Sequence, residues 1–162
     1  MARRVFFSFH YELDLWRANV VRNSWVAHDR EAAGFWDTAL WEEAKRFGDE
    51  AIRRTIDEGL NNTSVTAVLI GAETAGRPWL LYEIQKSYDR GNGLFGVYLN
   101  DIPDQYGFKD VMGPNPFKRL YIQVSGVLKW MSELYPTYSW DKDNGPQNFG
   151  TWVESAAKSA GR

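Results

Sequence analysis

The chain of 162 residues has the length of one domain, and a composition of 44% hydrophobic, 25% charged and 15% aromatic residues is that of a globular protein. Its 19 basic and 21 acidic residues give a net charge of -2, and no predicted face carries a basic stripe, which argues against a nucleic-acid partner bound through its phosphates. The lack of cysteine and the presence of only 2 histidines exclude disulfides, thiolate catalysis and Cys- or His-rich metal sites, so no metal is expected.

Three apolar runs predict buried strands. They lie at 5–7, 65–70 and 94–99, are rich in β-branched and aromatic residues, and do not alternate apolar with polar positions. Such runs are typical of parallel strands that are covered on both faces. A weaker strand is predicted at 34–37 and a final one at 137–140.

Segments with helical spacing separate these strands. In chain order, the predicted helices cover about 12–26, 49–59, 79–90 and 151–160. Leu13, Trp16 and Val20, with Val21 and Trp25 beside them, give the first helix an apolar stripe. Asp49 would cap the second, and Thr151, with a glutamate three residues later, would open the last.

Two regions are less regular. A long loop with several Pro and Gly residues is expected over 100–118, and loops of that length are usually functional or mobile. The region 124–140 is ambiguous, because Val127, Leu128 and Met131 favour a short helix before the final strand.

The alternation of strands and helices predicts an α/β fold: a single flavodoxin-like domain with a central parallel sheet and helices on both faces. This domain would span 1–162, with a core over about 1–120 and a C-terminal strand and helix over about 137–160. A G-x-G-x-x-G match at 91–96 ends a helix and enters a strand. That is the reverse of the dinucleotide-binding arrangement, so we interpret it as a turn.

The N-terminal apolar segment is too short for a signal peptide and lacks a small-residue cleavage site. No apolar run approaches the roughly 20 residues that are needed to cross a bilayer. We therefore expect a cytoplasmic protein without a membrane partner.

Ligands of open α/β sheets bind outside the carboxyl ends of the strands. Trp79 and Glu83 follow such a strand end and are four residues apart, so on a helix they share a face about 5–6 Å from each other. An indole can stack on a heterocycle, and a carboxylate can stabilise a developing positive charge. On spacing alone, a Trp packed under the preceding loop beside a solvent-facing Glu is the favoured interpretation, because a W-x-x-x-E match is common by chance. His10 is more readily a polar contact than a general base.

Four segments in the same order resemble the TIR domain and, more narrowly, the ThsB family of bacterial Thoeris antiphage systems. They are RVFFSFHY at 4–11, GLNNTSVT at 59–66, YEI at 82–84 and GPNPF at 113–117. The likeness covers roughly 1–120.

This resemblance implies an enzyme that consumes NAD+ as its substrate and needs no cofactor. Such an enzyme cleaves the nicotinamide–ribose bond and releases a cyclic ADP-ribose isomer, a second messenger that activates a separate NAD-degrading effector. The resemblance assigns the catalytic carboxylate to Glu83 and leaves room for self-assembly of TIR domains. The side chains expected to bind substrate are Ser8, Phe9, Trp79, Asp37 and Thr38. The segment 38–48 would close over the site.

Two other functions stay open. A non-enzymatic TIR adaptor would act only by self-association, and a nucleoside deoxyribosyltransferase-like enzyme would use a glutamate on another N-glycosidic bond. The residues themselves do not decide between hydrolysis and cyclisation, and only the resemblance favours cyclisation.

Overall fold

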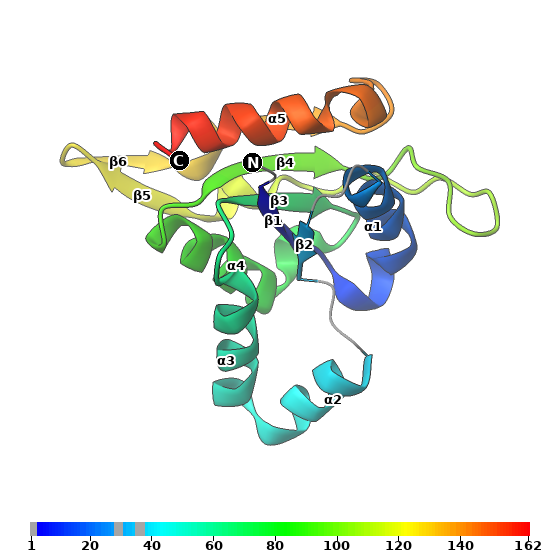
Figure 1. Ribbon diagram of the computed structural model, residues 1–162, viewed down its shortest axis with the longest axis horizontal. Helices are drawn as coiled ribbons and strands as arrows, with labels where there is room; N and C mark the ends of the chain where they lie inside the picture. The colour runs from blue at the N-terminus through cyan, green and yellow to red at the C-terminus, as the bar shows by residue number, and fades with distance from the viewer. Residues whose placement is uncertain (1–2, 28–30, 35–37) are drawn as a thin grey trace.

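The computed structural model describes residues 3–27, 31–34 and 38–162. Its centre is a sheet of five parallel strands in the order β2-β1-β3-β4-β7 (Figure 1). These strands are β1 (Arg4–Ser8), β2 (Glu31–Ala33), β3 (Val65–Ile70), β4 (Gly93–Tyr98) and β7 (Thr137–Ser139). The order is that of flavodoxin-like sheets, which confirms the predicted α/β class.

Helices cover both faces of this sheet. They are α1 (Tyr11–Val26), α2 (Thr38–Phe47), α3 (Asp49–Leu60), α4 (Pro78–Asp89) and α5 (Gly145–Ser159). In Figure 1, α5 lies above the sheet, whereas α2, α3 and α4 lie below it. All six residues of β3 are buried because both of its faces are covered.

The last helix is an integral part of the core on its face of the sheet. The ring of Phe149 stacks on Phe7 with centroids 5.8 Å apart, and it meets Phe95 and Trp25 edge-on, each at 5.6 Å. Since these rings come from α5, β1, β4 and α1, one aromatic cluster joins the two ends of the chain.

The buried face of α1 contains only part of the predicted apolar stripe, namely Val21 and Trp25. Leu13 and Trp16 are each 51% exposed, whereas the buried residues include Asp14 and Arg17. Arg17 is satisfied by the loop after β4, because its Nε donates to the carbonyl of Ile102 at 2.7 Å and its Nη2 to that of Phe108 at 2.8 Å. The helix is confirmed, but its inward face is partly polar.

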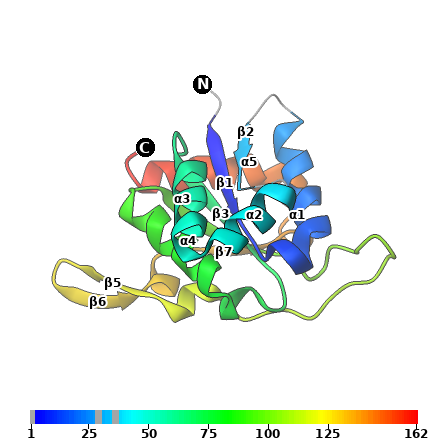
Figure 2. The same ribbon diagram turned by 90° about the horizontal axis from the view of Figure 1, so that it is seen from below.

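The chain between β4 and β7 differs most from the prediction. The predicted helix around 127–131 is wrong, because β5 (Tyr121–Val124) and β6 (Val127–Trp130) form an antiparallel hairpin. Ser125 and Gly126 both have positive φ, as a tight two-residue turn requires. Figure 2 shows this hairpin and the loop after β4 projecting at opposite ends of the molecule.

Short 3-10 helices complete the described chain. They are η1 (Thr74–Gly76), η2 (Pro116–Arg119) and η3 (Met131–Glu133). No helix in the described ranges has both the length and the apolar character that a membrane span needs.

The remaining predictions concern three segments. Of the weak strand predicted at 34–37, residues 35–37 lie outside the described residues, and β2 ends at Ala33. The last helix begins at Gly145, so Thr151 lies inside it and does not cap it. The segment 38–48, which the sequence analysis expects to close over the site, contains the helix α2.

Candidate active site

The candidate site lies where the sheet order reverses. The chain passes from β1 to β2 on one side and returns to β3 on the other, so the carboxyl ends of β1 and β3 flank a crevice. The α4 helix starts at this edge, after η1, with Pro78 in its first turn. Ligands of open parallel sheets bind at such a point.

Glu83 is on the buried face of α4. Leu80, Ile84 and Ser87 dock this helix on the sheet, and Glu83 falls among them in the helical repeat. The Glu83 residue is only 6% exposed. The Ser87 hydroxyl donates to the carbonyl of Glu83 at 2.8 Å, which fixes the backbone at that turn. The carboxyl group is therefore held inside the protein.

The Glu83 carboxyl has little electrostatic support. Burial raises its pKa well above the ordinary value, and the Ser8 hydroxyl opposes this shift. That opposition is weak, because Ser8 Oγ has no well-formed hydrogen bond in the described part of the chain. Desolvation favours the neutral acid until a positive charge comes close.

A cavity of about 90 Å³ lies beside this carboxyl group. Its walls come from the end of β1, the start of α1, the α2 helix and the start of α4. Phe9, Trp41 and Trp79 supply aromatic surface to it. Because pockets for small ligands usually measure about 300–1,000 Å³, this cavity has to widen before it can hold a dinucleotide.

Trp79 and Glu83 line the same cavity, as residues one helical turn apart on a common face can. The Trp79 indole is half-buried and packs edge-on against Tyr82, with centroids 5.6 Å apart. The Arg53 guanidinium lies 5.8 Å from the indole centroid. These neighbours fix one wall of the cavity.

The other residues that the sequence predicted for substrate binding are placed unequally. Phe9 lines the cavity, whereas Ser8 is fully buried behind it, facing Glu83. Thr38 is the first residue of α2. Asp37 lies outside the described residues. Their roles in binding stay predictions.

His10 lines the cavity but is held in a structural contact. Its Nδ1 accepts a hydrogen bond from the backbone N–H of Leu13 at 3.3 Å and so caps α1. Burial and the nearby Arg77 lower its pKa. A neutral imidazole with one nitrogen already engaged fits the polar contact that the sequence favoured.

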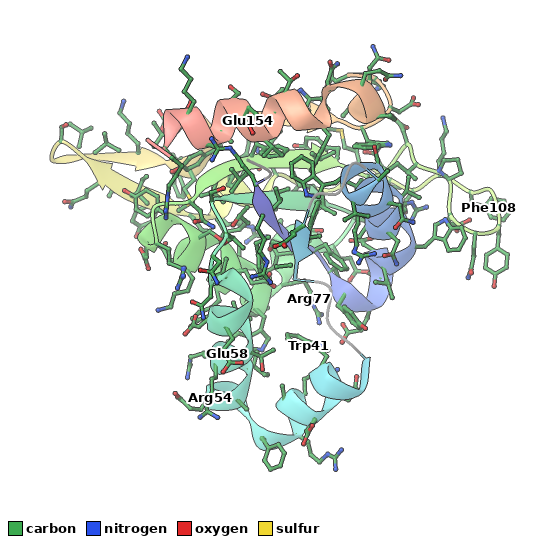
Figure 3. The ribbon with its side chains drawn as sticks, viewed as in Figure 1. Trp41, Arg54, Glu58, Arg77, Phe108 and Glu154 are labelled. Carbon is green, nitrogen blue, oxygen red and sulfur yellow. The ribbon has the colours of Figure 1, made fainter. Side chains whose placement is uncertain are left out.

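Three charged residues that sequence reasoning missed meet at the mouth of the cavity. Glu12 accepts from Lys45 Nζ at 3.1 Å and from Arg77 Nη2 at 3.3 Å. Burial alone would raise the pKa of Glu12, but the two cations outweigh it and the pKa is lowered. Figure 3 shows Arg77 and Trp41 facing the space between the sheet and α2.

Comparison with known proteins is consistent with this arrangement. Residues 6–104 match the family described as Thoeris protein ThsB, TIR-like domain. A protein of Bacillus cereus (strain MSX-D12), named as a candidate cyclic ADP-D-ribose synthase ThsB1, is 40% identical over 192 aligned residues. That alignment spans 94% of this chain and 100% of the relative. The chain therefore belongs to the ThsB family of TIR-like domains.

Proposed function

We propose that this protein cleaves the nicotinamide–ribose bond of NAD+ and makes a cyclic ADP-ribose isomer as a second messenger in Thoeris antiphage defence. The observation that carries the proposal is the buried Glu83 carboxyl at the wall of a cavity on the carboxyl edge of the sheet. The name of the Bacillus cereus relative, a candidate cyclic ADP-D-ribose synthase, supports the same reaction.

Cleavage of the nicotinamide–ribose bond requires one negatively charged group close to the ribose. Cleavage of an N-glycosidic bond passes through an oxocarbenium-like state, by analogy with glycoside hydrolysis. Nicotinamide leaves as a neutral group, so the step needs no general acid. A Glu83 carboxylate beside the ribose would stabilise the cation strongly, because a desolvated site screens charge poorly.

Substrate binding would also set the protonation state of Glu83. In the empty cavity, burial favours the neutral acid. The nicotinamide ring of NAD+ carries a positive charge, which lowers the pKa of a nearby carboxyl group. The carboxylate would thus form when the bond to be cleaved is in place.

The aromatic walls bear on what attacks the ribose next. Phe9, Trp41 and Trp79 would pack against the bound nucleotide and exclude water from the faces that they cover. A dry site favours attack by a group of the bound nucleotide itself, which gives cyclisation rather than hydrolysis.

The wider role follows from the same proposal. The cyclic product would activate a separate NAD-degrading effector, and assembly of TIR domains with one another would accompany activity. The protein would act in the cytoplasm.

The direct test is incubation of the protein with NAD+, followed by detection of nicotinamide and the nucleotide product by mass spectrometry. The same method would be applied to the small molecules of infected and uninfected cells that express the protein. Glu83→Gln is expected to abolish both products while the fold is retained. Glu58→Gln is the matched control, because Glu58 is exposed on α3 and does not line the cavity (Figure 3).

Other results would support the two alternatives. An adaptor would leave NAD+ intact in infected cells and would still signal as Glu83→Gln. A deoxyribosyltransferase-like enzyme would exchange the base of nucleosides and would leave NAD+ intact.

A further inference from the structure

The two cations at the cavity mouth come from different elements and both contact the Glu12 carboxylate, and Lys45 also pairs with Glu42 on its own helix at 2.9 Å. Lys45 lies on α2, Arg77 immediately precedes α4, and Glu12 lies in the first turn of α1. The side chains are 36%, 48% and 46% exposed, in that order. All three line the cavity that contains Glu83. They thus form a charged rim around its opening.

The diphosphate of NAD+ would lie at this charged rim when the substrate is bound. The inference rests on the proposed function, in which the nicotinamide ribose of NAD+ lies against Glu83. The diphosphate is attached to that ribose and carries two negative charges, so it would extend from the buried end of the cavity toward the mouth. Among the described residues that line the cavity, Lys45 and Arg77 are the Lys and Arg side chains. A guanidinium and an ammonium are the usual protein partners of phosphate oxygens.

We propose that Lys45 and Arg77 bind the diphosphate of NAD+, and that Glu12 occupies this place in the empty protein and is displaced by the substrate. The Glu12 carboxylate presents one oxygen to each cation, Oε1 to Lys45 and Oε2 to Arg77. A diphosphate would offer the same two cations oxygen atoms with more negative charge. Glu12 therefore competes with the substrate for the site.

The same exchange would enlarge the cavity. The pair of Glu12 and Lys45 ties α1 to α2 across the opening. Trp41 on α2 forms part of the wall. Release of Glu12 removes this tie, so that α2 can move outward when the dinucleotide enters.

Binding can be measured without turnover in the Glu83→Gln protein by isothermal titration calorimetry. Adding Glu12→Gln is expected to lower the Kd for ADP-ribose and for NAD+ about three- to tenfold, because both cations lose an internal partner. Adding Lys45→Gln or Arg77→Gln is expected to raise both Kd values by a similar factor. Glu43→Gln is the matched control, since Glu43 is exposed on the same helix as Lys45 and is not part of the rim.

Two comparisons separate displacement from a general effect of charge. Nicotinamide riboside carries no phosphate, so its affinity should not respond to Glu12→Gln. In the protein that also carries Lys45→Gln and Arg77→Gln, the gain from Glu12→Gln should disappear, as expected for coupled residues. Thermal unfolding of each variant checks that the fold is kept.

The proposal is overturned if Glu12→Gln changes ADP-ribose affinity no more than Glu43→Gln does, or if nicotinamide riboside gains as much. It is also overturned if ADP-ribose does not bind at all. Nicotinamide release by the wild-type protein is a separate measurement. If it never occurs, the proposed function fails, and the ADP-ribose series still decides whether Glu12 is displaced.

Discussion

The carboxyl group of Asp14 on α1 lies directly against the backbone of Gly71, the residue that follows β3. Asp14 is 3% exposed, and its Oδ2 has no hydrogen bond among the described residues. Burial raises its pKa to about 6, although the neighbouring Arg17 partly opposes the shift. This contact places an ill-supported charge at the strand end that also carries the candidate site.

Asp14→Asn is expected to stabilise the protein at neutral pH. The pKa of Asp14 is raised on folding from 3.8 to about 6, so the stability that the neutral acid provides is present below pH 3.8 and is lost as the pH rises through 6. The loss is about 3 kcal/mol at pH 7. Urea unfolding should show a gain for Asp14→Asn at pH 7.5 and little gain at pH 4. Equal gains at both pH values would contradict this account.

Gly71→Ala is expected to destabilise the fold by about 1–3 kcal/mol, because the added methyl group overlaps the Asp14 carboxyl. Adding Asp14→Ala should recover part of the loss. Gly113→Ala serves as the control, since its methyl group meets the Gly71 carbonyl, which is backbone and cannot be trimmed. If Asp14→Ala rescues both glycine variants equally in chemical denaturation, the overlap is not the cause.

Activity should fall on the acidic side of its pH profile at a higher pH than an ordinary glutamate would give. Burial raises the pKa of Glu83, and the proposed mechanism needs the carboxylate, so kcat/KM should rise as the pH increases through that raised pKa. The rise in kcat should lie at lower pH, because the bound cation favours ionisation. Steady-state rates from pH 5 to 9 test this, and a rise near the pKa of an ordinary glutamate in both profiles would be the contrary result.

The stability of the Glu83→Gln variant provides an independent check. A raised pKa in the folded state means that stability is lost as the pH rises through it, and a neutral amide avoids that loss. The melting temperature of Glu83→Gln should exceed that of the wild type at pH 8 by more than at pH 5. A variant less stable than the wild type at pH 8 would show that the carboxylate is well supported after all.

Trp79→Ala is expected to cost about 2 kcal/mol of stability and to raise KM for NAD+, because the indole packs on Tyr82 and forms a wall of the cavity. Trp79→Phe should restore most of the stability and part of the binding. Melting temperature and KM, measured on both variants, separate the two effects. Unchanged KM in a folded Trp79→Ala protein would remove Trp79 from the substrate wall.

The central sheet could be predicted from the sequence because β1, β3 and β4 are buried on both faces. Uninterrupted apolar runs are the direct result of such burial. The common face of Trp79 and Glu83 could be predicted from their helical spacing after a strand end. The burial of Glu83 could not, since spacing alone favours a solvent-facing side chain.

The hairpin and the charged rim could not be predicted from the sequence, and the reason differs between them. Val127 and Leu128 are both more than half exposed, so β6 lacks the alternation that marks a strand. The Ser125–Gly126 pair was the available turn signal. The rim joins Glu12 to residues 33 and 65 positions away, and only the packing of α1, α2 and α4 brings these together.

The poorly solvated state of Glu83 has a consequence for which form of the dinucleotide is consumed. The reduced form has an uncharged dihydronicotinamide ring, which cannot draw the proton from a buried acid and would not depart as a neutral molecule. A buried, neutral acid of this kind therefore distinguishes the oxidised from the reduced coenzyme by charge, without a separate contact to the ring. Reducing equivalents held by the cell as the reduced coenzyme would be spared.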